Sequence, residues 1–191
     1  MEVTQRAGFD SRPRQGHRGP VVAHVMLACC IVVAALMVFY TAVSPARAAG
    51  EEGWTGYAPG TVVISQSRRR LYLITEDGTP MSYPVAVGKS GKQWRGTVSI
   101  DGKYRNPAWA PPAEVKRAEP WLPNYIAGGS PHNPMGMRAL TLTGGEYAIH
   151  GTNRPMTIGT AASYGCIRMY NRDIVDLFDR VAVGTPVIMM P

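Results

Sequence analysis

Prolines are concentrated in one part of this chain. The segment 106–134 holds seven of the sixteen prolines, together with Trp109 and Trp121. Proline has no backbone N–H and clashes with the preceding turn of a helix, so this density argues against any helix there. Tryptophan is uncommon in disordered segments. We therefore predict a long, ordered loop, of the kind that usually carries function in a compact domain.

The sequence on both sides of this loop is typical of strands. β-Branched and aromatic residues recur in short runs, and the pairs Asp77-Gly78 and Gly144-Gly145 are turn signals. We expect strands at residues 61–65, 71–75, 81–87 and 97–100 before the loop, and at 140–142, 147–150 and 186–189 after it.

One stretch near the end of the chain has helical periodicity. Asn171 stands where an N-cap is expected, and Gly184 stands where the helix would end. Apolar residues between them recur at spacings of three and four, which places them on one helix face, namely Ile174, Leu177, Phe178 and Val181. The sequence thus predicts a mainly β domain with one main helix.

The first 49 residues have the composition of an export signal. Residues 1–19 are polar and basic, residues 21–43 are almost wholly apolar, and Ala46 and Ala48 form a small-residue cleavage site. The apolar run is also long enough to span a bilayer, which takes about 20 residues. We expect either a cleaved signal peptide or an uncleaved anchor helix whose basic side faces the cytoplasm.

Both alternatives place the rest of the chain outside the cytoplasm, in the periplasm or cell envelope. We expect residues 50–60 to be a linker and residues 61–191 to be one domain. The whole chain has a net charge of +7, and the part from Ala49 onward has +4, because it contains 15 Lys and Arg and 11 Asp and Glu. An exported protein has little access to nucleic acid, so this mild basicity suits an anionic envelope polymer or simple solvation.

Cys166 is the only cysteine beyond the apolar segment, which holds Cys29 and Cys30. Exported domains commonly use cysteines in pairs, so a single one suggests an intermolecular bond or a reactive thiol. Attack by sulfur on a carbonyl needs a base and donors for the oxyanion. His150 ends an apolar strand and can serve as the base. The backbone N–H groups of Gly165 and Cys166 are candidate oxyanion donors.

Other interpretations of these residues stay open at this level. Cys166 can be a buried small side chain, and His132 can be a turn residue or a substrate contact. Cys166, His150 and His132 can form a zinc site, although their spacings match no compact ligand motif. Arg168 can clamp a substrate carboxylate or pair with Asp173.

Several motifs resemble one family. Residues 149–153 (IHGTN) and 163–169 (SYGCIRM), with fifteen residues between His150 and Cys166, resemble the signature of YkuD-type L,D-transpeptidases. Residues 106–112 (NPAWAPP) and 133–136 (NPMG) resemble the branch of that family that contains the ErfK and YbiS proteins. The resemblance extends from about residue 60 to residue 189 and implies an L,D-transpeptidase β-sandwich.

The resemblance also implies residue roles. Cys166 would be the acylated nucleophile, His150 its base, and Gly151 the carbonyl that orients His150. Ser163, Tyr164, Gly165 and Arg168 would form the oxyanion and substrate-binding surroundings. Many family members have histidine where this chain has Tyr164, so the contribution of a second histidine cannot be transferred. No metal and no organic cofactor is implied.

The implied substrate is the peptidoglycan stem peptide. Cys166 would attack the carbonyl of its third residue, expel the terminal D-alanine and pass the acyl group to an amine. The amine of a second stem peptide would give a 3-3 cross-link, and an envelope lipoprotein would become attached to the wall. A non-catalytic peptidoglycan-binding module and hydrolytic trimming by the same thiol remain the alternatives.

Overall fold

The computed structural model describes Trp54, residues 56–145 and residues 147–191. The chain divides into Met1–Glu51 and Glu52–Pro191, and all of the described residues belong to the second unit. The predicted signal or anchor lies outside the described residues, as do residues 50–53 and 55 of the predicted linker, so both stay predictions. Within the described residues, no helix is long and apolar enough to cross a membrane.

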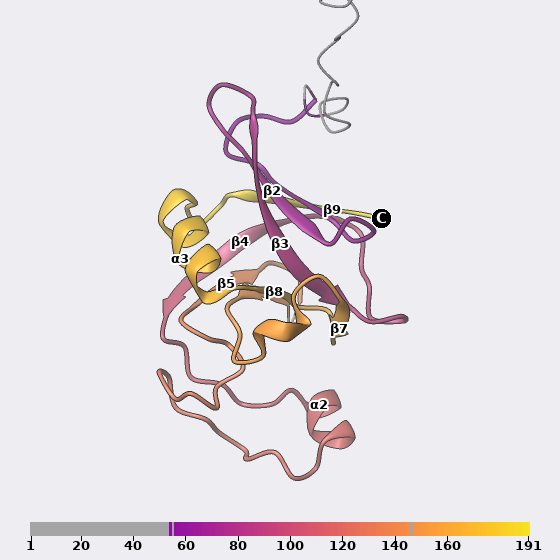
Figure 1. Cartoon of the computed structure of the whole chain (residues 1–191), viewed down its shortest axis with the longest axis vertical. Coiled ribbons are helices and arrows are strands. Elements are labelled where there is room, and N and C mark those ends of the chain that lie inside the picture. The colour runs from indigo at the N-terminus through magenta and orange to yellow at the C-terminus, as the bar shows by residue number, and fades with distance from the viewer. Residues whose placement is uncertain (1–53, 55, 146) are drawn as a thin grey trace, which may run out of the picture. The chain divides into compact units, whose positions relative to one another are not determined.

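The described part of the chain is mainly β with one main helix, as predicted (Figure 1). Its helical segments are α2 (Ala113–Ala118), the 3-10 turn η1 (Pro155–Thr157) and α3 (Asn171–Arg180). Its strands are β1 (Val62–Ser65), β2 (Arg70–Ile74), β3 (Pro80–Gly88), β4 (Gly96–Arg105), β5 (Arg138–Leu142), β6 (Ala148–His150), β7 (Ala161–Ser163), β8 (Ile167–Met169) and β9 (Pro186–Met190).

Two long strands join two layers of sheet into one closed surface. The strand order is β2-β1-β9-β4-β5-β6-β8-β3-β7, and β2 also pairs with β3. The first half of β3 pairs with β2 and its second half with β8. In the same way, β4 pairs first with β9 and then with β5. Because β3 and β4 pass from one layer to the other, the strands enclose a common core.

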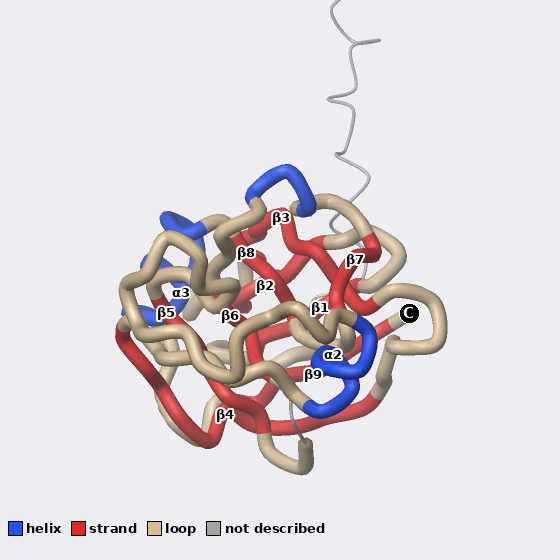
Figure 2. Tube along the Cα trace, turned by 90° about the horizontal axis from the view of Figure 1, so that it is seen from below, coloured by secondary structure: helices blue, strands red, loops and turns tan. Residues whose placement is uncertain are grey.

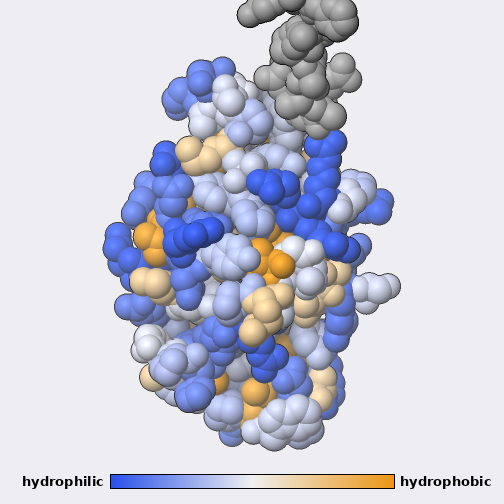
Figure 3. Space-filling model, in the orientation of Figure 1, coloured by the Kyte–Doolittle hydropathy of each residue, from blue (hydrophilic) through white to orange (hydrophobic). Residues whose placement is uncertain are grey.

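The core lies between these layers and α3. Figure 2 shows the course of these strands and helices along the backbone. Apolar side chains of α3 at the predicted spacing are buried in the core, namely Ile174, Leu177 and Phe178, and Val181 at the C-cap is buried as well. They pack with fully buried strand residues such as Ile64, Leu140, Ile149 and Ile167. The helical periodicity of the sequence therefore identified a true core-facing helix. Figure 3 shows that the outer surface on one side is largely hydrophilic, with apolar residues in separate small patches.

Three structural details differ from the sequence predictions. The prediction that proline excludes any helix from residues 106–134 is wrong, because α2 forms between Pro112 and Pro120. Pro112 stands at the N-cap, where a helix needs no intrahelical N–H bond, and the next proline comes after the helix has ended. The short strands β7 and β8 were also missed.

The third difference concerns the two ends of α3. The helix ends at Arg180, with Val181 as its C-cap, and not at Gly184 as predicted. Asn171 is the first residue of the helix rather than its N-cap, and the N-cap, Tyr170, makes no side-chain capping bond. The side chain of Asn171 reaches away from the helix and accepts backbone N–H groups of Met137 and Thr152 in two loops.

The C-terminal end of α3 is capped from the sheet by Lys103. Its Nζ atom donates to the carbonyl oxygens of Phe178 and Val181 at 2.6 and 2.5 Å and lies 4.4 Å from the centre of the Phe178 ring. The last carbonyl groups of a helix have no partner within it, and a cation at this end also interacts favourably with the negative end of the helix dipole. Lys103 thereby links the C-terminal end of α3 to β4 by hydrogen bonds.

We predict that Lys103→Met lowers the free energy of unfolding by about 1–3 kcal/mol, since two carbonyl groups lose a charged donor. Urea denaturation at neutral pH measures the change. The matched control is Arg117→Met, which removes a cation from an exposed position on α2 and should change stability by less than about 0.5 kcal/mol. Equal losses in the two variants would contradict the capping role.

Candidate active site

The pairing of β6 with β8 places the predicted catalytic residues on one face of the sheet. These strands are parallel, with Ile149 opposite Ile167 and His150 opposite Arg168. Side chains alternate between faces along a strand, so Ile149 and Ile167 enter the core, where each is no more than 1% exposed. His150, Arg168 and Cys166, which precedes β8, therefore face the opposite way.

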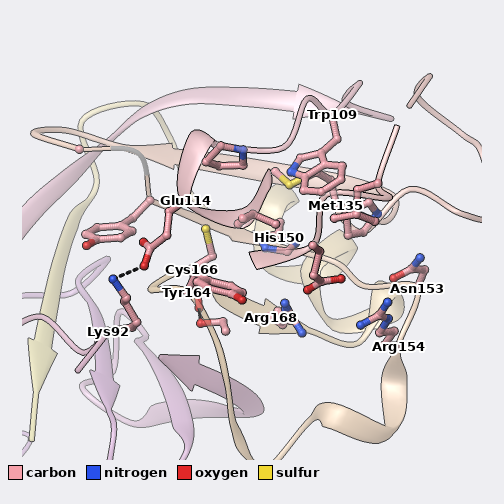
Figure 4. A pocket seen from close by; sticks show the side chains of 18 of the residues that line it. Lys92, Trp109, Glu114, Met135, His150, Asn153, Arg154, Tyr164, Cys166 and Arg168 are labelled. Atoms are coloured by element: carbon pink, nitrogen blue, oxygen red, sulfur yellow. Dashed lines mark hydrogen bonds and ion pairs between the residues drawn. The ribbon is translucent and has the colours of Figure 1, made fainter. Parts of the chain in front are cut away.

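A cavity of about 420 Å³ lies over this face and brings together His150, Cys166, Tyr164, Ser163 and Arg168. In Figure 4 the sulfur of Cys166 is drawn between Glu114 and His150, and Arg168 points into the same cavity. The opposite wall comes from the proline-rich segment, which contributes Trp109, Glu114, Val115, Glu119, Leu122 and Ile126. The loop predicted to be functional thus forms one wall of the cavity.

His150 is a buried, neutral imidazole with a defined orientation. Its side chain is only 4% exposed, and its Nδ1 atom lies 2.7 Å from the carbonyl oxygen of Gly151. A carbonyl oxygen can only accept, so Nδ1 carries the hydrogen and Nε2 keeps its lone pair. Burial, reinforced by the nearby positive charge of Arg168, lowers the pKa of His150 to about 4, although the carbonyls of Gly151 and Pro134 favour the protonated ring.

Cys166 is held as a thiol rather than a thiolate. Burial raises the pKa of the Cys166 thiol above its ordinary value, while a hydrogen bond with the Ala148 backbone and the positive charge of Arg168 act in the opposite direction. Burial is the largest of these effects, because a low-dielectric environment disfavours the charged form. The pair therefore rests as a neutral thiol beside a neutral imidazole.

The turn before Cys166 is fixed by hydrogen bonds and by Gly165. The hydroxyl of Ser163 donates to the Cys166 carbonyl oxygen at 2.5 Å and accepts the Gly165 N–H at 3.1 Å. The indole N–H of Trp94 donates to the Gly165 carbonyl at 3.1 Å. Gly165 has φ +122°, and a Cβ there would lie 2.2 Å from the Tyr147 ring, so only glycine fits.

These contacts bear on the predicted roles of two residues. Ser163 is 1% exposed and its hydroxyl serves the turn, so a direct contact between Ser163 and substrate stays a prediction. The Gly165 N–H likewise serves the turn, and the predicted oxyanion role of the Cys166 N–H is untested.

Tyr164 and Arg168 line the same cavity as Cys166. The Lys89 ammonium lies 3.6 Å from the centre of the Tyr164 ring, an attraction between a cation and the ring face. Burial lowers the pKa of Arg168 from its ordinary value, an effect that Arg154 reinforces and Glu119 opposes. Asp173, the predicted alternative partner of Arg168, instead contacts Nε of Arg172 at 3.2 Å.

The structure adds charged residues that the sequence reasoning missed. Lys92, in the loop between β3 and β4, forms an ion pair with Glu114 of α2 across the cavity edge (Figure 4). Both side chains are about one-third to two-fifths exposed, so the pair contributes at most about 1 kcal/mol. Glu119 and Arg154 also line the cavity. The charged residues of the proline-rich segment were the available signal, because a long ordered loop usually borders a site.

His132 lines the same cavity as His150 and Cys166. Even so, no group of three or more His, Cys, Asp or Glu side chains within the described residues is arranged to hold a metal ion. Of the residues named in the zinc hypothesis, His150 has its Nδ1 directed to a backbone carbonyl.

The fold and the cavity define a β-rich domain that presents a thiol and an imidazole together. Residues 59–189 match the family model of the YkuD L,D-transpeptidase catalytic domain. The probable L,D-transpeptidase YbiS of Escherichia coli (strain K12) is 39% identical over 135 residues, which are 66% of this chain and 43% of YbiS. The aligned region thus spans less than half of that relative.

Solved structures show the same fold at low sequence identity. L,D-transpeptidase 3 from Mycobacterium tuberculosis superposes with a TM-score of 0.54 at 16% identity, over 69% of this chain and 60% of that one. The L,D-transpeptidase LdtMt1 in complex with imipenem superposes with a TM-score of 0.52 at 18% identity, over 68% and 58%. The chain belongs to the YkuD family of L,D-transpeptidase catalytic domains, as its motifs predicted.

The low pKa of His150 in the folded protein predicts how the free energy of unfolding depends on pH. The pKa is about 4 in the folded protein and near the ordinary 6.5 in the unfolded chain. Between these pH values only the unfolded chain binds the proton, so this contribution to stability is complete above about pH 6.5 and is lost as the pH falls toward 4. The loss amounts to about 3 kcal/mol, at about 1.4 kcal/mol per pKa unit.

Urea denaturation of the wild type and of His150→Gln, at neutral pH and at about pH 4 to 4.5, measures this contribution. The stability of the variant should depend less steeply on pH, because carboxyl groups titrate in both proteins and their effect cancels in the comparison. Parallel pH profiles for the two proteins would show that His150 is not buried in its neutral form.

Proposed function

We propose that this domain is a cysteine-dependent L,D-transpeptidase that remodels peptidoglycan. The observation that carries the proposal is the placement of Cys166 and His150 in one cavity, with Nδ1 of His150 bonded to Gly151. The family membership supports the same reaction class. Peptidoglycan stem peptides are the proposed substrate, and the exported chain would act in the periplasm or cell envelope.

In the proposed first step, the sulfur of Cys166 attacks the carbonyl carbon of the third stem residue. Nε2 of His150 takes the thiol proton as the S–C bond forms, so neither group needs to be charged beforehand. The tetrahedral intermediate then collapses, the C–N bond to the terminal D-alanine breaks, and His150 returns the proton to the departing amine. The product is a thioester on Cys166.

In the second step, an acceptor amine attacks the thioester carbonyl. The amine loses a proton to the neutral His150, the C–S bond breaks, and the proton passes back to the sulfur. A second stem peptide as acceptor gives a cross-link, and a lipoprotein amine gives attachment to the wall. Arg168 suits a carboxylate of the donor peptide, because a guanidinium pairs with carboxylates in a fork geometry.

The apolar lining of the cavity supports transfer to an amine over loss to water. The proline-rich segment forms one wall of the cavity that contains Cys166, and its Trp109, Val115 and Ile126 side chains give that wall an apolar lining. A bound donor peptide against this wall would limit the access of water to a thioester. Hydrolytic trimming becomes prominent in this proposal only where the acceptor is absent.

A carbapenem tests the nucleophile directly. We predict that the intact wild-type chain gains the mass of one carbapenem and that Cys166→Ala gains none. Since the variant keeps Cys29 and Cys30, it controls for reaction at other thiols. His150→Gln should react at least about 100-fold more slowly, since a general base contributes about that much. Intact-mass spectrometry over time gives all three results.

Two outcomes would contradict the proposal. Folded wild-type protein without an adduct would show that Cys166 is not activated, and an adduct that persists in Cys166→Ala would place the reaction elsewhere. Incubation with isolated sacculi separates the remaining alternatives. New cross-links indicate transpeptidation, shortened stems indicate trimming, and co-sedimentation without any product indicates a binding module.

A further inference from the structure

The side chain of Asn171 connects three segments that meet behind His150. Its Oδ1 atom accepts the backbone N–H groups of Met137 and Thr152, each at 3.2 Å. Its Nδ2 atom donates to the carbonyl oxygen of Thr152 at 3.0 Å. One amide therefore joins the start of α3 to the loop before β5 and to the loop after β6. None of these bonds belongs to the helix itself.

Two glycines make room for this amide. A Cβ added at Gly151 would lie 2.1 Å from Oδ1 of Asn171, and one added at Gly136 would lie 2.2 Å from it. Contacts this short do not occur, so any side chain at either position would expel the amide. Gly136 also has φ +65°, a conformation that favours glycine. The position of Asn171 thus depends on the absence of side chains at both residues.

The bond to Thr152 acts on the peptide unit that orients His150. The carbonyl of Gly151 and the N–H of Thr152 belong to one planar peptide group and point in opposite directions. The carbonyl end accepts the Nδ1–H of His150 at 2.7 Å, and the N–H end donates to Oδ1 of Asn171. Asn171 and His150 therefore bind the two ends of the same peptide.

We propose that Asn171 is a positioning residue for His150 and acts through the Gly151–Thr152 peptide. By fixing the plane of that peptide, Asn171 keeps the Gly151 carbonyl directed at Nδ1 and so keeps the hydrogen on Nδ1. Nε2 then presents its lone pair toward Cys166. Hydrogen bonds in such a series also polarise one another, which strengthens the bond to the imidazole.

The charged surroundings of His150 do not supply this orientation by themselves. The charged side chain that acts on His150 is Arg168 on β8, and its charge disfavours protonation of the ring without selecting a nitrogen. The carbonyl groups of Gly151 and Pro134 favour a hydrogen on the ring. Of these two, the Gly151 carbonyl is the one whose peptide Asn171 holds.

The test is the protonation state of the His150 ring, measured by 15N NMR on the full chain at neutral pH. The His150 signals are assigned by their absence from His150→Gln. The wild type should show a protonated Nδ1 and an unprotonated Nε2. In Asn171→Leu the two nitrogens should move toward a shared average, and acylation of Cys166 should slow about 10- to 100-fold, as when other residues that orient a histidine are lost.

Two further variants separate positioning from simple stabilisation. Asn171→Asp keeps an oxygen that accepts the Thr152 N–H, and it should keep the hydrogen on Nδ1 even if the lost Nδ2 bond lowers the melting temperature. Lys103→Met weakens the other end of α3, and it should lower the melting temperature while leaving the His150 signals and the acylation rate unchanged.

Two results would overturn the proposal. One is an Asn171→Leu protein that folds and keeps the wild-type His150 signals. The other is loss of the Nδ1 hydrogen in folded Asn171→Asp, which would decide the question even if Asn171→Leu does not fold. The acylation readout rests on the proposed function, whereas the NMR readout does not. A failure of transpeptidation with intact His150 signals would therefore leave this inference standing.

Discussion

The parallel pairing of β6 and β8 is the constraint on which the site depends. It sets Ile149 and Ile167 into the core and, one residue along each strand, turns His150 and Arg168 toward the cavity. A shift of one residue in this register would bury the imidazole in the core and expose two isoleucines. Packing of the core therefore also determines which side chains are available for chemistry. Stability and function depend here on the same register.

The electrostatics of the site result from the same burial. Removing His150 and Cys166 from water lowers the pKa of the imidazole and raises that of the thiol, so both groups rest uncharged. In the proposed mechanism a neutral pair still reacts, because the proton passes from sulfur to nitrogen as the bond to the substrate forms. This requires a ring with the correct nitrogen unprotonated, which is why the backbone behind His150 matters. The bond from Nδ1 to Gly151 meets that requirement.

Much of the fold and the centre of the site could be predicted from the sequence, for identifiable physical reasons. Alternating and β-branched runs predicted most of the strands, and three- and four-residue spacing predicted α3. The three-residue strands β7 and β8 were not predicted, because so short a segment shows no clear alternation of apolar and polar residues. The proline density led to the prediction that no helix forms at α2, although Pro112 stands at a position where a helix tolerates proline.

The side chains around Cys166 were predictable only where they belong to a local motif. His150 and Cys166 stand in such motifs, but the pairing of Lys92 with Glu114 joins segments that are 22 positions apart and have no shared pattern. Asn171 was predicted to be a helix N-cap from its local sequence, whereas its hydrogen-bond partners lie 19 and 34 positions away. Contacts of this kind depend on the closed sheet and are set by tertiary structure rather than by local sequence.

The neutral resting state of Cys166 is the property of the site that can be measured most directly. Ultraviolet absorbance of the thiolate, followed during a pH titration as the difference between wild type and Cys166→Ala, measures that state and cancels the signal of Cys29 and Cys30. We predict no thiolate from Cys166 at neutral pH and its appearance only in the alkaline range, above the ordinary pKa of a thiol. A thiolate that is already present at neutral pH and disappears only in acid would contradict the neutral pair, since it would mean a charged pair of Cys166 and His150.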